Sequence, residues 1–142
     1  MAGLKPGDEV ITPACTFPTT VAPLCQLNLK PIFCDVELRT LVPSISQIME
    51  KVTQRTRAIF IPNLAGSKPD WSGLKRACAK LGRLDIFLIE DSCDTMTHTI
   101  DSDISIISFY ESHVITAGGG GGMVMCNNKK NLNIGFAYRD WG

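Results

Sequence analysis

The sequence lacks several features that would assign it to a familiar class of protein. Lysine plus arginine equals aspartate plus glutamate, 14 each, so its charge predicts no affinity for nucleic acid or for an acidic membrane surface. No apolar run reaches the roughly 18–20 residues that span a bilayer. The N-terminus, MAGLKPGDEV, has no apolar signal core. We therefore expect no nucleic-acid partner, no membrane partner and a cytoplasmic location.

The six cysteines form no C-x-x-C pair, and they stand singly in apolar stretches at positions 15, 25, 34, 78, 93 and 126. This spacing argues against a zinc site and against a disulfide scaffold. We predict no metal, and reduced thiols that are buried and pack as small hydrophobic side chains.

Histidine is scarce, with only two in the chain, whereas glycines 118–122 form an unbroken run. A phosphate-binding P-loop needs G-K-[ST] leading into a helix, but here the run leads into the apolar stretch MVMC. A flexible turn without ligand contact is the alternative. His113 shortly precedes the glycines, in a loop, and a single histidine there is either structural or catalytic. His98 is interpreted as a surface residue.

Short apolar runs alternate with helical patterns along the chain. The 142 residues, of which 44% are hydrophobic and 20% charged, suffice for one globular domain with a core. Nearly unbroken apolar runs are typical of strands buried on both faces. We predict an α/β fold, a three-layer α/β/α sandwich with a mostly parallel sheet. The expected strands are 9–12, 31–36, 58–62, 86–89, 104–109 and 123–126, and the expected helices are 18–29, 44–52, 71–82 and from 127 or 128 to 137.

Polar clusters follow several of the predicted strands, at residues 12–20, 63–70, 90–94 and 108–113. In open α/β sheets, ligands bind beyond the carboxyl ends of the strands, so these clusters predict a shared site. Asp91 directly follows a buried strand, where a carboxylate is costly unless it is paired. Its partner could be a cation, backbone amides or a protonated cofactor nitrogen; a turn or helix cap is the alternative.

The segments IEDSCDTM and SFYESHVITAGGGGGMV resemble the DegT–StrS family of pyridoxal-phosphate (PLP)-dependent nucleotide-sugar aminotransferases. GLKPGDEVITPACTFPTTVAP, PIFCDV and RAIFIPNLAGSKPDW resemble the same family in the same order. The resemblance implies the aspartate-aminotransferase fold, whose large domain is an α/β sandwich with a mostly parallel sheet. It also implies that residues 1–142 are part of that domain, without its N-terminal segment and the C-terminal small domain, and that the full-length parent is a homodimer.

The resemblance assigns cofactor-binding roles to four residues. Asp91 matches the aspartate that keeps the pyridine nitrogen protonated, so that the ring acts as an electron sink. Phe17 matches the aromatic residue that stacks on the ring, and Ser108 matches a serine near the phosphate. Asp94 stands where many members have a glutamine near the ring hydroxyl.

His113 stands where most members of the family carry the lysine that holds the cofactor as an imine. An imidazole cannot form that imine, but it can act as a general base. SFYxxHxIT and a segment like YRDWG (138–142) occur in the subgroup of 3-dehydratases of nucleotide-linked 4-keto-6-deoxyhexoses. The resemblance therefore implies non-covalent pyridoxamine phosphate (PMP), a nucleotide-linked sugar substrate and C3 dehydration in deoxysugar biosynthesis of the lipopolysaccharide or O-antigen type. The alternatives are an aminotransferase-like protein with other amino-sugar chemistry and a non-catalytic truncated fragment.

Overall fold

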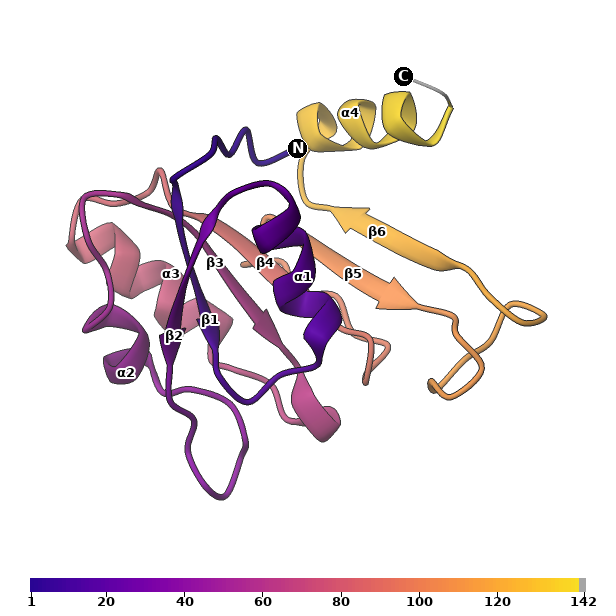
Figure 1. Cartoon of the computed structure of the whole chain (residues 1–142), viewed down its shortest axis with the longest axis horizontal. Helices are drawn as coiled ribbons and strands as arrows, with labels where there is room; N and C mark the ends of the chain where they lie inside the picture. The colour runs from indigo at the N-terminus through magenta and orange to yellow at the C-terminus, as the bar shows by residue number, and fades with distance from the viewer. Residues whose placement is uncertain (141–142) are drawn as a thin grey trace.

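Six strands form one sheet in the computed structural model, which describes residues 1–140. The strands lie in the order β2-β1-β3-β4-β5-β6 (Figure 1). All neighbouring pairs are parallel except β5 and β6, which are antiparallel. The predicted mostly parallel sheet is therefore confirmed. The bounds are β1 Glu9–Pro13, β2 Lys30–Cys34, β3 Thr56–Pro62, β4 Phe87–Asp91, β5 Ile104–Ser108 and β6 Gly122–Cys126.

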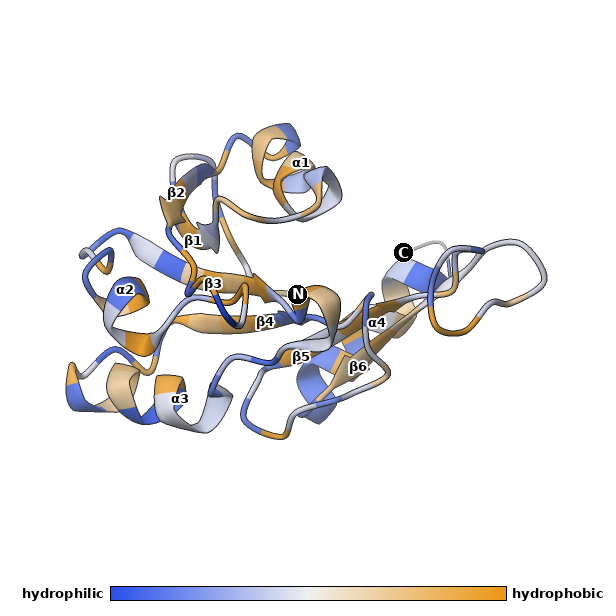
Figure 2. Ribbon diagram, turned by 90° about the horizontal axis from the view of Figure 1, so that it is seen from below, coloured by the Kyte–Doolittle hydropathy of each residue, from blue (hydrophilic) through white to orange (hydrophobic). Residues whose placement is uncertain are grey.

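Helices cover both faces of the sheet, as the prediction of three layers requires. Helix α1 (Pro18–Gln26) lies on one face, and α2 (Ile45–Met49) and α3 (Trp71–Lys80) lie on the other (Figure 2). A short 3-10 helix, η1 (Leu64–Gly66), follows β3, and α4 (Lys129–Arg139) follows β6. In the described part of the chain, none of the helices has the length and apolarity needed to cross a membrane.

Side-chain caps begin three of the helices at the predicted residues. Ser44 and Gln47 form a reciprocal capping box at α2, which satisfies backbone N–H groups that have no partner within the helix. Asp70 Oδ1 accepts a hydrogen bond from Gly73 N at 2.8 Å at the start of α3, and Asn128 accepts one from the backbone of α4. Helix α1 has no side-chain cap and begins with proline instead. It ends at Gln26, three residues before the predicted end.

Alternation along the central strands divides the core between the two faces. Ile11, Ile59 and Ile61 pack with Trp71 and Leu74 on the side of α2 and α3. The intervening residues of β1 and β3, together with Leu24 and Leu29, form a second cluster on the side of α1. Strand β6 is largely exposed, unlike the central strands. The predicted burial on both faces therefore holds only for the interior of the sheet.

All six cysteines are free, as predicted, but their predicted burial is only partly right. Cys34 and Cys78 are buried, and burial raises the pKa of Cys34 to about 11. Cys15 and Cys25 are exposed, so the prediction is wrong for them. Cys15 lies in the loop after β1, and Cys25 lies near the end of α1 on its outer side, where apolar neighbours in the sequence do not produce burial.

Candidate active site

A cavity of about 820 Å³ opens at the carboxyl ends of the parallel strands, on the face that carries α1. Such a volume is in the range of small-molecule sites. All four polar clusters predicted to share a site contribute to its wall. The lining residues are Cys15, Thr16, Phe17, Thr19, Thr20, Pro62, Asn63, Leu64, Asp91, Cys93, Asp94, Ser108, Tyr110, Ser112 and His113.

The cavity brings together all five residues singled out in the sequence. They come from three loops that are far apart in the chain: Phe17 after β1, Asp91 and Asp94 at the end of β4, and Ser108 and His113 at the end of β5. Parallel pairing of β1, β3, β4 and β5 puts these strand ends at one edge of the sheet.

Asp91 is the last residue of β4, and the residue is only 7% exposed. Its Oδ2 accepts a hydrogen bond from Thr20 Oγ1 at 2.9 Å, and its Oδ1 accepts one from Cys93 N at 3.1 Å. Within residues 1–140, no lysine or arginine lies within ion-pair distance of it. A buried carboxylate with neutral donors alone favours the approach of a cationic group.

Cys93 also lines the cavity beside this carboxylate. Burial, together with the hydrogen bond and negative charge of Asp91, raises the pKa of the Cys93 thiol to about 12. The thiolate is the nucleophilic form of cysteine, so Cys93 is a neutral wall residue at physiological pH.

His113 and Asp94 lie close to each other in the cavity wall. His113 Nδ1 lies 3.8 Å from Asp94 Oδ1. Asp94 Oδ2 in turn accepts a hydrogen bond from Ala65 N at 3.1 Å, and Ala65 has a left-handed backbone with φ of 51°. The imidazole also packs edge-on against Tyr110, with ring centroids 6.3 Å apart. Asp94 is thus oriented by a backbone amide and lies next to the only imidazole in the cavity wall as described.

Phe17 offers an open aromatic face. It occupies the N-cap position of α1 in an extended conformation, and 67% of it is exposed. Ser108, at the end of β5, accepts a hydrogen bond from Tyr110 N at 3.2 Å through its hydroxyl, so its own hydroxyl proton is available to a ligand.

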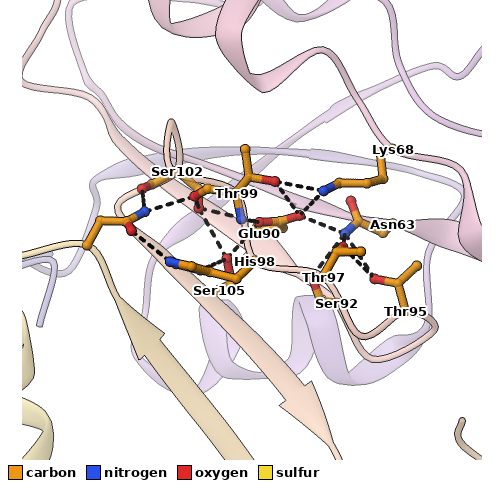
Figure 3. Close-up of polar contacts among 11 residues, drawn as sticks. Asn63, Lys68, Glu90, Ser92, Thr95, Thr97, His98, Thr99, Ser102 and Ser105 are labelled. Atoms are coloured by element: carbon orange, nitrogen blue, oxygen red, sulfur yellow. Dashed lines mark hydrogen bonds and ion pairs between the residues drawn. The ribbon is translucent and has the colours of Figure 1, made fainter.

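A polar network supports the site from the opposite face of the sheet (Figure 3). Glu90 is fully buried at its centre. It accepts hydrogen bonds from Ser105 Oγ at 2.6 Å, Asn63 Nδ2 at 2.8 Å and Thr99 N at 3.0 Å. Burial opposes ionisation of Glu90, but these hydrogen bonds and the charge of Lys68 outweigh it and lower its pKa. The network joins the loop after β3 to the loop after β4.

His98 extends this network to the edge of the sheet. Its Nδ1 lies 3.0 Å from Ser105 Oγ, and its Nε2 lies 2.7 Å from Asn127 Oδ1. Asn127 Nδ2 donates to Thr99 O at 2.8 Å. His98 is exposed, as interpreted from the sequence, but it also holds the β4–β5 loop against the end of β6. Sequence reasoning missed this role because its partners are 7 and 29 residues away.

The glycine run forms the turn between the β5 loop and β6 and is absent from the described cavity wall. Gly118, Gly119 and Gly121 have φ of 69°, 121° and 130°, which residues with a side chain rarely adopt. At Gly122, a Cβ would approach Ile107 O to 2.9 Å. The glycines therefore serve the backbone, and the interpretation as a turn is preferred to that of a phosphate cradle.

Comparisons with known proteins identify the family and agree with this fold. The model of the DegT/DnrJ/EryC1/StrS aminotransferase family matches residues 1–142. The lipopolysaccharide biosynthesis protein RfbH of Salmonella typhimurium is 40% identical over 146 residues, which cover 98% of this chain and 32% of that protein. The dTDP-4-dehydro-2,6-dideoxy-D-glucose 3-dehydratase of Saccharopolyspora spinosa is 40% identical over 148 residues, which cover 99% of this chain and 31% of that protein.

A solved structure shows the same fold. The crystal structure of NtdA from Bacillus subtilis with bound cofactor PMP is similar with a TM-score of 0.83 and 27% identity, over 91% of this chain and 30% of that one. The chain therefore spans about a third of the length of the relatives that it matches.

Proposed function

The chain belongs to the DegT/DnrJ/EryC1/StrS aminotransferase family, and on this premise we propose that the protein is a PMP-dependent 3-dehydratase of a nucleotide-linked 4-keto-6-deoxyhexose. His113 is its general base. The 40% identity to a 3-dehydratase over 99% of the chain supports this reaction. The similarity to a lipopolysaccharide biosynthesis protein supports a place in bacterial surface-sugar chemistry.

The observation that carries the proposal is the imidazole in a cavity wall without lysine. Among residues 1–140, the side chains that line the cavity include His113 but no lysine. Lys68 lies in the loop after β3, but its ammonium pairs with Glu90 at 3.4 Å on the opposite face of the sheet. An amine is needed to hold an aldehyde cofactor covalently, whereas an imidazole can accept and return a proton. This arrangement favours dehydration over amino transfer.

The residues present fit a pyridoxamine-type cofactor. Asp91 is a buried carboxylate without a cationic partner among residues 1–140, which suits a protonated ring nitrogen. The exposed ring of Phe17 suits stacking on a pyridine ring, and the Ser108 hydroxyl suits a phosphate oxygen. When bound, PMP supplies an amine for the sugar ketone and a ring that accepts electron density.

Asp94 gives the imidazole its orientation in this scheme. A carboxylate beside one ring nitrogen favours the proton there and leaves the other nitrogen as the base. Asp94 Oδ1 lies 3.8 Å from His113 Nδ1, so in this scheme Nδ1 faces the carboxylate and Nε2 is the nitrogen that accepts the proton. This role differs from the contact with the ring hydroxyl that the glutamine of other members suggests.

We extend the proposal to the rest of the protein. Residues 1–142 serve as part of the large domain, because the chain spans about a third of its relatives, and the active unit is a homodimer. The cavity wall, as described, contains no lysine or arginine for a phosphate, which supports further contacts from outside these residues. Light scattering of the protein from its complete coding sequence tests the dimer.

Product analysis tests the reaction. When the protein from its complete coding sequence is incubated with PMP and a nucleotide-linked 4-keto-6-deoxyhexose, the sugar should lose its C3 hydroxyl, as followed by mass spectrometry. His113→Ala should abolish the loss. His98→Gln is a matched control, because His98 lies outside the cavity. The glutamine amide can still form hydrogen bonds with Ser105 and Asn127, so this variant should keep most of the activity. An unchanged rate in His113→Ala contradicts the assignment of the base.

A further inference from the structure

We propose that Thr20 is a positioning residue that aims the Asp91 carboxylate at the cofactor ring. This inference rests on the proposed function and deepens it, because it names a residue that acts through Asp91. Thr20 lies in α1, and Asp91 lies 71 residues later at the end of β4.

The contact between the two residues is buried and directional. Thr20 is 1% exposed and Asp91 is 7% exposed. Thr20 Oγ1 donates to Asp91 Oδ2 at 2.9 Å. An ionised carboxylate only accepts hydrogen bonds, so the hydroxyl proton must point to Asp91. Hydrogen bonds to ionised groups are about twice as strong as neutral ones.

The hydroxyl restricts the rotation of the carboxylate. Cys93 N donates to the other oxygen, Oδ1, at 3.1 Å, so each oxygen is held from a different segment. With both oxygens held, the carboxylate plane is fixed while each oxygen retains a lone pair for one more donor. Without the Thr20 hydroxyl, Oδ2 loses its side-chain donor and the carboxylate can turn about its Cβ–Cγ bond.

The same turn of α1 also carries the aromatic residue. Thr20 N donates to Phe17 O at 3.0 Å, and Phe17 is the N-cap of the helix. One backbone hydrogen bond and one side-chain hydrogen bond therefore connect the backbone of Phe17 to the carboxylate of Asp91. Helix α1 therefore links the position of the Phe17 backbone to that of the Asp91 carboxylate.

Three variants of the protein from its complete coding sequence test the role of the hydroxyl. Thr20→Val keeps the shape and removes the hydroxyl, and Thr20→Ser keeps the hydroxyl. Asp91→Asn removes the carboxylate charge and reports on the proposed function itself. Thr20→Ala also lacks the hydroxyl and replaces Thr20→Val if that variant does not fold. The measurements are the dissociation constant of PMP and the ¹⁵N chemical shift of its labelled pyridine nitrogen, which reports protonation of the ring.

We expect Thr20→Val to weaken PMP binding by about tenfold and to reduce protonation of the pyridine nitrogen, while Thr20→Ser stays close to the wild type. A purely structural role in α1 would lower the melting temperature without moving the nitrogen shift, and that result overturns the inference. Wild-type binding and nitrogen shift in Thr20→Val, together with a loss in Asp91→Asn, overturn the role of Thr20 alone. No effect of Asp91→Asn overturns the proposed function as well.

Discussion

Glu90 and Asp91 are consecutive residues of β4 whose carboxylates lie on opposite faces of the sheet. Asp91 faces the cavity and Thr20 of α1. Glu90 faces Asn63, Thr99 and Ser105 on the other side (Figure 3). The two buried carboxylates therefore have different roles. Asp91 is available to a ligand, whereas Glu90 stabilises the loops that shape the cavity.

Glu90→Gln should destabilise the protein by about 1–3 kcal/mol. Asn63 Nδ2 and Thr99 N both donate to the Glu90 carboxylate, so the amide N–H groups of a glutamine would face these donors. Urea denaturation followed by circular dichroism measures the loss. Glu37→Gln changes an exposed glutamate and should stay within about 0.5 kcal/mol of the wild type. Equal stability of both variants would contradict the importance of the Glu90 network.

The stability of the wild type should fall in acid partly through Glu90. Its pKa is lower in the folded state than its ordinary value of 4.5, so the folded state binds fewer protons than the unfolded state and stability rises with pH in this range. The contribution of Glu90 to stability is complete above its ordinary pKa and is lost as the pH falls through its pKa in the folded state. Urea midpoints measured from about pH 7 to about pH 3 should decline less steeply in Glu90→Gln. Glu9, whose pKa is also lowered, leaves a residual slope in both proteins. Parallel curves would contradict the prediction.

Thiol labelling tests the cavity without any assay of activity. Cys15 and Cys25 are exposed and should react first. Burial raises the pKa of Cys34 to about 11 and is the main cause of the rise in the pKa of Cys93 to about 12. These two thiols should therefore react slowly. Only Cys15 of the exposed pair lines the cavity. PMP should therefore slow the labelling of Cys15 several-fold and leave Cys25, the internal control, unchanged. Equal rates for Cys15 with and without PMP at saturating concentration would argue against binding in this cavity and favour a non-catalytic fragment.

Borohydride reduction separates the dehydratase from an aminotransferase-like protein. After addition of PLP, the wild type should yield no stoichiometric lysine adduct by peptide mass analysis, because the described cavity wall contains no lysine. His113→Lys restores an amine at that position and should yield one adduct on residue 113. A stoichiometric lysine adduct in the wild type would favour amino-sugar chemistry of another kind.

Much of the architecture could be predicted from local signals. Apolar runs mark the central strands because both of their faces are buried, and Ser44 and Asp70 mark helix starts because their oxygens satisfy free backbone N–H groups. The polar clusters at strand ends predicted the cavity, since parallel strands bring their carboxyl ends to one edge. The exposure of Cys25 could not be predicted in this way, because it depends on which side of α1 meets the sheet.

The arrangement within the site depends on contacts between distant segments. The hydrogen bond from Thr20 to Asp91 spans 71 residues, and the approach of His113 to Asp94 depends on the conformations of two loops. The role of Glu90 had a local signal that was not used: alternation along a strand sends two adjacent carboxylates to opposite faces. The segment YRDWG reaches residues 141–142, which lie outside the described residues.

The central claim is that His113 moves a proton at the cofactor, and hydrogen exchange at the PMP methylene carbon tests it most directly. In D₂O, with the nucleotide-linked 4-keto sugar present, proton NMR should show loss of one methylene hydrogen in the wild type and in His98→Gln. The account predicts that His113→Ala still binds PMP but exchanges this hydrogen at least about 100-fold more slowly. Exchange at the wild-type rate in His113→Ala would contradict it.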